Sequence, residues 1–440
     1  MVGSFLVAPV VARGASRPVA DHPSDLLQPT FSIGRSGALK LAEAERIVDA
    51  VESTGADGHV VRYGAVGLTR HVRNGRILER LTGNWRIPMA TLVVPVEYVR
   101  DLGGESMAQV AAAGRLILGK KAAELRDAQV GDVLVLRDSR FRPREFTVGA
   151  IVDEQFVNWN EIMMSDVAAS TLGNVPITRV AITDIPSYQK VVSALSRKGF
   201  APGNTWRVRR SWDLENPDGT LGLASTKELL GEFAYKPAGG SAIRVSPEWL
   251  RSSISWSHRF SGIGLRFNCN RKIAAQVQGA LDEIRASGLA RHIDVRNSNR
   301  YGGCYVGRYN RLGGAFGSPS RHAWGMAIDV NTVTNAQGAL PTMNCSVVRI
   351  FRKWGFAWGG NFRPHDGMHF EYVGEPRDGL GYPSRFCPNK VDVPTTTLPD
   401  FSPTTTVPES SSSVVTSSTA PPDSTVVPPT PTTAPVTSNT

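Results

Sequence analysis

The most constraining feature of this sequence is the position of its cysteines. All four lie in the last part of the 440-residue chain, at Cys269, Cys304, Cys345 and Cys387, and the 268 residues before them contain none. This clustering predicts a separate C-terminal domain with its own covalent chemistry, in a chain that is too long for one ordinary domain. The spacings contain no Cys-x-x-Cys motif, so a structural zinc knuckle is not expected.

We expect these cysteines to form two disulfide bonds, which are typical of an oxidising compartment. Three pairings are possible. The favoured pairing joins Cys304 to Cys345 and Cys269 to Cys387, because the second bond would tie the two ends of the domain together. Buried free thiols are the alternative.

The C-terminal end of the chain has a composition that cannot form a hydrophobic core. Of residues 391–440, 33 are Ser, Thr or Pro, and no Lys or Arg occurs among them. Such a segment cannot offset its ordering entropy, because it offers no periodic apolar face. We therefore expect a disordered, extended tail over 389–440, which is typical of exported surface proteins.

The N-terminal end, residues 1–29, contains a short apolar run over 5–12 that is broken by Pro9 and ends in small residues. No Lys or Arg precedes the run, as a signal peptide would require. Either this run is part of a signal whose true start lies upstream, or it is a remnant of a membrane segment, or it has no such role. No apolar stretch approaches 18 residues, so no transmembrane anchor is evident. The expected location is extracytoplasmic, either secreted or associated with the cell wall.

The net charge of +10 is carried by the part of the chain that precedes the acidic tail. A basic body favours anionic partners such as nucleic acid, anionic lipid or an anionic wall polymer. A solvated basic surface is the alternative. Because no stripe of basic and aromatic residues or nucleic-acid motif occurs, no nucleic-acid partner is expected.

Residues 30–235 are expected to form a mixed α/β accessory domain. Apolar runs predict a strand over 92–96 and a hairpin of strands over 133–136 and 146–152. Helical spacing predicts a helix over 108–125. His59 and His71 lack convincing partners, so no catalytic site is expected there.

Three segments of this region, 119–123, 130–136 and 146–152, resemble the extracytoplasmic core domain of MacB- and FtsX-type permeases. The membrane helices that flank this domain in such permeases are absent from the sequence. The resemblance implies a docking module without chemistry of its own, which would bind an envelope protein partner.

A linker is expected over 236–264, followed by the cysteine-containing domain over 265–388. Ser246 and Pro247 predict the start of a short helix, with the serine as N-cap. A longer amphipathic helix is predicted over 271–287. Its apolar face is formed by Ile273, Val277, Leu281 and Ile284.

Two short segments of this domain carry the candidate chemistry. His322, Asp329 and His369 supply two imidazoles and a carboxylate, which is the ligand set of a catalytic zinc with one open position. The residues around Asp329 read as a strand, and a second strand would place His369 and Glu371 on one face. Asp366 precedes His369 at a turn, where its carboxylate could lie beside a metal-bound water.

An alternative metal site would pair His365 with His369 on one face of a helix. Pro364 and Gly367 make a helix improbable at this position. Taken singly, each of these histidines would be read as a hydrogen-bonded core residue, so the prediction depends on the joint pattern.

The pattern S-x-H-x-x-G-x-A-x-D over 320–329, followed by D-x-x-H over 366–369, resembles a family of peptidoglycan hydrolases. These are the zinc D-alanyl-D-alanine carboxypeptidases and L-alanyl-D-glutamate endopeptidases. The resemblance implies an α+β domain with a small antiparallel sheet flanked by helices, and Zn²⁺ as cofactor. It also implies peptidoglycan stem peptides as substrate, cleaved at bonds that involve D-amino acids.

Carried over to this sequence, the resemblance implies zinc on His322, Asp329 and His369, with Asp366 as general base. An arginine upstream of the first motif would bind the carbonyl or carboxylate of the substrate, and Arg308 is the best match, with Arg311 as the other candidate. Ser320 and Trp358 are expected on the substrate side of the site.

Two departures from the family pattern leave it undecided which peptide bond is cleaved. Asp366 stands where the carboxypeptidases usually have Glu, and Glu371 replaces a further histidine, so the sequence is nearer to the endopeptidase branch. The competing hypothesis is a catalytically silent zinc-fold binding module that docks an envelope complex. Loss of Asp366 or of a ligand would indicate such a module, and neither is lost.

Overall fold

The structure is a computed structural model that describes residues 29–203, 205–213, 218–295, 301–310, 315–377 and 386–387. These residues belong to one of the two units into which the chain divides, residues 1–403. The predicted leader, apart from its last residue, and the predicted tail lie outside the described residues. Arg311 also lies outside them.

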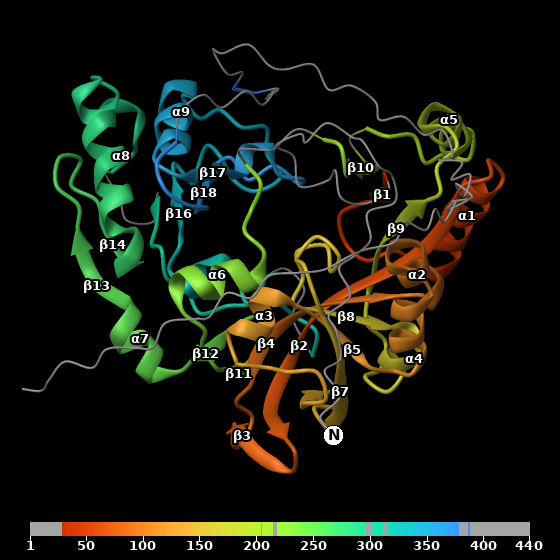
Figure 1. Cartoon of the computed structure of the whole chain (residues 1–440). Helices are drawn as coiled ribbons and strands as arrows, with labels where there is room; N and C mark the ends of the chain where they lie inside the picture. The colour runs from red at the N-terminus through yellow and green to blue at the C-terminus, as the bar shows by residue number, and fades with distance from the viewer. Residues whose placement is uncertain are drawn as a thin grey trace, which may run out of the picture. The chain divides into compact units, whose positions relative to one another are not determined.

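The first part of the chain folds into a large mixed sheet with short helices around it (Figure 1). Its strands are β1 (Phe31–Gly34), β2 (Asp57–Arg73), β3 (Arg76–Arg80), β4 (Ile87–Val94), β5 (Leu116–Gly119), β6 (Val133–Arg137), β7 (Pro143–Val152), β8 (Ile162–Ser165), β9 (Ile177–Thr183) and β10 (Arg207–Arg210). The helices are α1 (Leu41–Glu52), α2 (Val96–Ala112), α3 (Lys120–Glu124), α4 (Asp166–Ala169) and α5 (Tyr188–Arg197).

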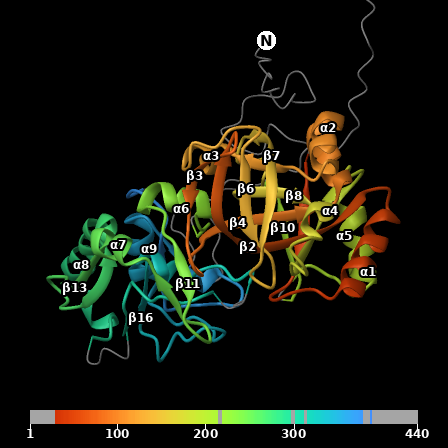
Figure 2. The same cartoon turned by 90° about the horizontal axis from the view of Figure 1, so that it is seen from below.

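Six of these strands close into a barrel-like ring in the order β2, β4, β8, β5, β7, β6 and back to β2 (Figure 2). The ring closes because β2 is 17 residues long and pairs with β4 and then with β6 along its length. Apolar side chains fill the interior, among them Val66, Leu68, Met89, Leu134 and Val148. The predicted hairpin is confirmed as β6 and β7, and the predicted strand over 92–96 overlaps the end of β4.

The predicted helix over 108–125 is wrong in its middle. Helix α2 ends at Ala112, Gly114 adopts a positive φ of 68°, and β5 follows before the short α3. All four residues of β5 are buried, and the strand pairs with β7 and β8. The apolar run was therefore compatible with a helix by spacing, but its partners make it a central strand.

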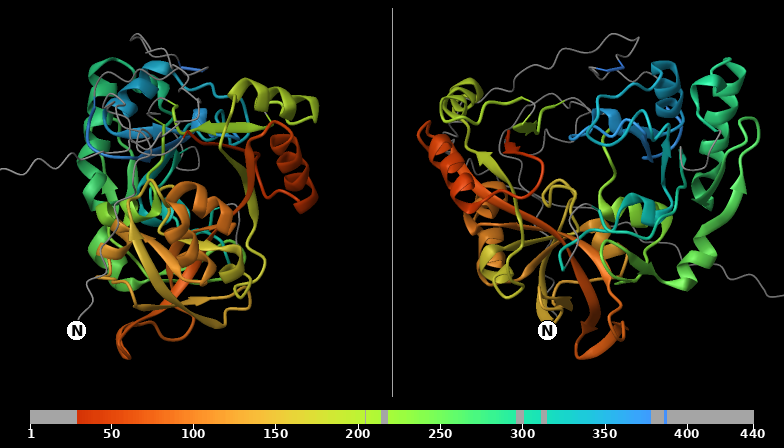
Figure 3. Two further views of the ribbon diagram at one scale, coloured as in Figure 1. Left: turned by 45° about the vertical axis from the view of Figure 1, so that its right-hand side comes forward. Right: turned by 180° about the vertical axis from the view of Figure 1, so that it is seen from behind.

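Beyond the barrel, the sheet continues through β9 and β1 to β10. Figure 3 shows α1 (red) and α5 (yellow-green) together on one side of this extension. Phe31 and Ile33 of β1 point to that side, where they pack with Ile47 of α1 and Val191 and Leu195 of α5. The alternate residues of these strands therefore face the other way.

His59 and His71 do have partners, contrary to the expectation from sequence. The Nε2 atom of His59 lies 2.8 Å from a carboxylate oxygen of Asp101, and that of His71 lies 2.7 Å from one of Asp132. Both histidines are buried. These carboxylates are distant in sequence, so the pairs are long-range contacts that hold the fold together.

The second part of the described chain begins with α6 (Leu223–Leu230) and carries several short elements. Its strands are β11 (Tyr235–Pro237), β12 (Ile243–Val245), β13 (Ile254–Arg259), β14 (Arg266–Asn270), β15 (Tyr301–Gly302), β16 (Ala327–Val330), β17 (Phe356–Trp358) and β18 (His369–Tyr372). The α-helices are α7 (Pro247–Ser253), α8 (Ala274–Ala286) and α9 (Cys345–Lys353), and the 3-10 helices are η2 (Arg271–Ile273), η3 (Ala290–His292), η5 (Arg321–Trp324) and η6 (Gly359–Asn361).

The segment 236–264, expected as a linker, is structured. It contains β12, α7 and β13, and Ile243, Trp249 and Ile254 are buried in the same core as α8 and β16. Helix α7 begins as predicted, since the Ser246 side chain accepts a hydrogen bond from the Trp249 backbone. These apolar side chains are scattered among Gly, Pro and charged residues, so the composition of the segment did not indicate that they share a core.

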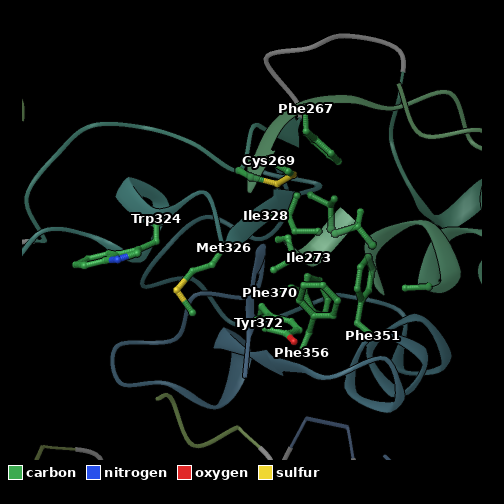
Figure 4. Close-up of a cluster of buried hydrophobic side chains, with 14 of the residues drawn as sticks. Phe267, Cys269, Ile273, Trp324, Met326, Ile328, Phe351, Phe356, Phe370 and Tyr372 are labelled. Carbon is green, nitrogen blue, oxygen red and sulfur yellow. A yellow bond between two sulfur atoms is a disulfide. The ribbon is translucent and has the colours of Figure 1, made fainter. Parts of the chain in front are cut away.

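The last four strands form an antiparallel sheet in the order β15, β16, β18, β17. Ile328 and Phe370 project from one face of it into a core that includes Phe351 and Phe356 (Figure 4). Helix α8, whose N-terminal turn is η2, buries the apolar face that the sequence predicts. The opposite face of β16 and β18 is thereby left for polar side chains.

Two disulfide bonds are present, but the favoured pairing was wrong. Cys269 is bonded to Cys304, and Cys345 to Cys387, with Cα–Cα separations of 4.7 and 5.1 Å. The backbone N–H of Tyr305 donates to the carbonyl of Asn268 at 2.7 Å, which brings the first pair together. Pairing follows such local approaches of the backbone, because the bond tolerates only a narrow range of Cα separations.

Each disulfide should contribute substantially to stability. The bonded residues are 35 and 42 positions apart, and closing loops of this size is worth roughly 4 kcal/mol in the chain-entropy model. Replacing either pair by serines should lower the denaturation midpoint, measured by chemical unfolding. Peptide mapping without reductant should recover the two linked peptides, and a peptide linking Cys304 to Cys345 would contradict the structure.

Within the described residues, none of the helices combines the length and the apolar character needed to cross a membrane.

Candidate metal centre

Two neighbouring strands hold the first two candidate ligands. Asp329 of β16 and His369 of β18 are direct partners across the antiparallel ladder, and Ala327 is the partner of Glu371. Directly opposed residues project from the same face of a sheet, so the polar side chains gather on the face opposite Ile328 and Phe370. The His369 Nδ1 atom lies 3.0 Å from the Oδ1 atom of Asp329.

The third ligand is supplied by the 3-10 helix η5, which precedes β16. Ser320 caps this helix by accepting a hydrogen bond from the backbone of His322, and Gly325 ends it with a φ of 63°. A Cβ atom at Gly325 would lie 2.9 Å from the backbone nitrogen of Asn270, so the chain can pass this point only with glycine. The tight turn places the Nε2 atom of His322 at 3.4 Å from Asp329.

The three side chains together could hold one metal ion. One ligand atom from each of His322, Asp329 and His369 lies within 4.8 Å of the others, and all three residues are wholly or largely buried. The Nε2 atom of His322 is buried, and apart from its 3.4 Å contact with Asp329 it has no hydrogen-bond partner among the described residues. A buried polar atom without a partner is costly, and a metal ion at this position would satisfy it.

The second ring nitrogen of His322 and of His369 also has a polar partner. His322 donates from Nδ1 to the carbonyl of Cys304 at 3.2 Å, and the Nε2 atom of His369 lies 3.4 Å from Glu371. Metal-binding histidines commonly donate their other N–H to a carbonyl or carboxylate in this way, which fixes the ring and its tautomer. The donor set therefore has the outer contacts expected of a metal site.

The electrostatics of the three side chains agree with a site for a cation. Burial by itself would raise the pKa of Asp329, but hydrogen bonds and charges from His322 and His369 hold it well below its usual range. Burial by itself would lower the pKa of His369, but Asp329 and Glu371 raise it to about 10. The site thus stabilises positive charge, and a metal ion bound to Nδ1 of His369 would displace a proton from it.

Arg321, which was not predicted as a site residue, contacts the outer partner of His369. The Nε atom of Arg321 lies 3.2 Å from a carboxylate oxygen of Glu371. Arg321 is held in turn by α6 and the segment before it, since it donates to the Thr226 hydroxyl of α6 at 2.7 Å and to the carbonyl of Leu221. Arg321 lies within the first motif, which is the one signal that the sequence offered for it. Its partner in α6, Thr226, is 95 residues away in sequence, so no local pattern connects the two.

Asp366 lies at the turn before β18, as predicted. Its backbone donates to the carbonyl of Gly359 at 2.8 Å, and its own carbonyl accepts from the backbone of His369 at 3.0 Å. The side chain accepts a hydrogen bond from Gln337 at 3.1 Å. Backbone contacts therefore maintain the turn without the carboxylate of Asp366.

The alternative site with His365 and His369 on a helix is wrong. The residues before β18 form turns, and the bond between Arg363 and Pro364 is cis. The Nδ1 atom of His365 donates to the carbonyl of Gly360 at 2.9 Å. This histidine therefore supports the loop.

A cavity of about 2010 Å³ includes the polar face of β16 and β18. Among the residues that line it are Arg308, Ser320, Arg321, Asp329, Asp366 and His369. The structure therefore brings Asp366 and Arg308 to the same cavity as two of the metal-ligand candidates. Arg308 also donates to the carbonyl of Tyr309 at 3.3 Å.

Trp358 and Ser320, both expected on the substrate side, make contacts that support the site. Trp358 is fully buried and is not among the described residues that line the cavity, and its indole N–H donates to the carbonyl of Gly367 at 2.9 Å, so it supports the turn that contains Asp366. Ser320 lines the cavity, and its side chain caps η5. Contact of either residue with a substrate stays a prediction.

The sequence comparisons agree with this part of the structure. A family model described as D-alanyl-D-alanine carboxypeptidase matches residues 314–372. No curated protein matches the chain. The matched segment contains His322, Asp329, Asp366 and His369 and leaves residues 30–235 without a match, so the resemblance of that region to permease domains stays a prediction. The segment that builds the candidate metal centre is similar to the D-alanyl-D-alanine carboxypeptidase family.

Proposed function

We propose that this protein is a zinc-dependent peptidase that cleaves bonds involving D-amino acids in peptidoglycan stem peptides. The observation that carries the proposal is the convergence of His322, Asp329 and His369, with an unsatisfied buried nitrogen on His322. This convergence lies within the segment that is similar to the carboxypeptidase family.

The donor set suits zinc in its catalytic form. Two imidazoles and one carboxylate leave a fourth position open, and each imidazole has an outer hydrogen-bond partner. When bound, zinc supplies a Lewis acid that polarises the scissile carbonyl and lowers the pKa of water.

Residues of the chain carry out proton transfer, substrate binding and the positioning of His369. Asp366 accepts a proton from the attacking water and returns it to the leaving amine, while Gln337 orients its carboxylate. Arg308 lines the same cavity and binds the carbonyl or carboxylate of the substrate. Arg321 is committed to Glu371, so it positions His369 indirectly.

The proposed location is extracytoplasmic. Two disulfide bonds in the described residues are typical of oxidising compartments, and the proposed substrate is found outside the cytoplasm. The region over 30–235 is proposed as an accessory module that docks an envelope protein.

The decisive experiment is digestion of purified peptidoglycan fragments by the zinc-loaded protein, with products identified by mass spectrometry. Loss of a terminal D-alanine would identify a carboxypeptidase, and cleavage between L-alanine and D-glutamate would identify an endopeptidase. A chelator should stop the reaction, and zinc should restore it. If the zinc-loaded protein binds but does not cleave these fragments, the binding-module hypothesis replaces the peptidase.

A further inference from the structure

A second group of charged residues faces the same cavity from the other part of the described chain. In the extension of the sheet, Arg207 of β10 and Arg179 of β9 both pair with Gly34 of β1. Arg209 pairs in the same way with Ser32, two residues along. These residues share the face opposite Phe31 and Ile33, which pack against α1 and α5 (Figure 1).

This face is part of the cavity that contains the candidate metal centre. Arg179, Arg207, Arg209 and Arg363 line that cavity together with Asp366 and His369. We refer to these four arginines as the arginine cluster. Arg363 reaches the sheet extension directly, since it donates to the carbonyl of Gly203 at 2.8 Å and its own carbonyl accepts from Ser36.

Tyr63 of β2 connects the two groups of charges. Burial raises the pKa of Tyr63, and the charges of both Arg321 and Arg179 oppose this rise. Arg321 contacts Glu371 at the metal centre, and Arg179 belongs to the arginine cluster. Tyr63, Arg179 and Arg321 all line the same cavity, so a single extended ligand could contact all three.

Arg207 and Arg179 lie close to other positive charges. Burial, together with the charges of Arg209 and Arg363, lowers the pKa of Arg207 to about 10. Arg179 is affected in the same direction by burial and by Arg209. Among the described residues, no carboxylate contributes to either shift. Arg210, which lines the same cavity, is by contrast paired with Asp213.

We propose that the arginine cluster is a second substrate subsite, which binds a carboxylate of the peptide at a distance from the bond that is cleaved. The proposal rests on the proposed function and specifies its substrate as an acidic peptide. Guanidinium groups bind carboxylates through paired, charge-assisted hydrogen bonds, and such a ligand would offset the repulsion among the arginines. A peptide carboxylate is favoured over a wall phosphate because the cluster lies in the cavity of the metal centre.

The test compares two charge-matched double variants of the full-length, zinc-loaded protein. Arg179→Gln/Arg207→Gln removes two charges from the cluster. Arg76→Gln/Arg80→Gln removes two from exposed positions of β3, which do not line the cavity. Each is made in an Asp366→Asn background, so that the ligand is not consumed. Calorimetry then measures the binding of a stem peptide with free side-chain carboxylates and of its amidated counterpart.

The free peptide should bind the parent and the β3 variant about tenfold or more tightly than the amidated peptide, as expected for charge-assisted contacts. The cluster variant should bind both peptides equally while keeping the circular dichroism spectrum of the parent. If the cluster variant and the β3 variant prefer the free peptide over the amidated peptide to the same extent, the proposal is overturned. Preferential binding of a phosphate polymer, with no discrimination between the peptides, would also overturn it.

The outcome is separable from that of the proposed function. Discrimination between the peptides is a binding measurement and does not require cleavage. If the wild-type protein does not hydrolyse the peptide, while the parent protein still binds the free peptide more tightly than the amidated one, only the proposed peptidase activity is contradicted. Hydrolysis by the wild-type protein without discrimination between free and amidated peptides would contradict the arginine subsite alone.

Discussion

Replacing His369 by alanine should remove zinc from the purified protein and abolish its hydrolysis of wall peptides. His369 is one of three candidate ligands, and its direct pairing with Asp329 fixes its position. Changing only an outer partner of a metal ligand typically weakens binding by 10- to 100-fold, so losing a ligand should cost at least about 100-fold in zinc affinity. Elemental analysis and competition with a chromogenic chelator would measure this loss.

Two further variants calibrate that result. Glu371→Gln keeps the shape of the partner of His369 but removes its charge, and it should weaken zinc binding by about 10- to 100-fold. His365→Ala changes a histidine of the preceding loop whose ring donates to a backbone carbonyl, and it should keep its zinc. Full zinc content in the His369→Ala protein would show that the ligands are assigned wrongly.

Replacing Asp366 by asparagine should reduce the rate of peptide hydrolysis by about 10²- to 10⁴-fold, which is the usual contribution of a general base. Asparagine has nearly the same size and can still accept the hydrogen bond from Gln337, but it cannot take up a proton at neutral pH. Steady-state kinetics on the peptide identified by digestion would give the rate, and elemental analysis would give the zinc content.

The fold and the metal should survive this change. Backbone hydrogen bonds to Gly359 and from His369 maintain the turn at Asp366, and the ligand candidates do not include its side chain. Gln337→Ala serves as the matched control, since it removes the partner of the carboxylate but leaves the carboxylate in place. Hydrolysis by the Asp366→Asn protein at the wild-type rate would mean that Asp366 only supports the turn.

The local features of the candidate site were predictable from residue patterns alone. The alternation of residues around Asp329 and His369 predicted two strands with their polar side chains on one face, and the ladder confirms both. The apolar spacing over 271–287 predicted a helix that buries Val277 and Leu281. Such patterns are readable because the period of a strand or helix decides which side chains share a face.

Contacts between residues that are distant in sequence depend instead on how the segments pack. Cys269 bonds to Cys304 because a backbone hydrogen bond brings their segments together, and Trp358 is buried behind the turn that it supports. The run over 108–125 contains a strand because β7 and β8 pair with its centre. These outcomes depend on packing between segments that are far apart in sequence, and no local period records them.

The same reason explains why the cavity could not be foreseen. Arg321 contacts Glu371 only when η5 packs beside β18, and Arg179 and Arg207 reach the same cavity only because both of their strands pair with β1. Each of these arginines is unremarkable in its own sequence context. The candidate metal ligands could be predicted from the sequence because they lie in two short motifs, whereas the charges around them come from strands and helices that the fold alone assembles.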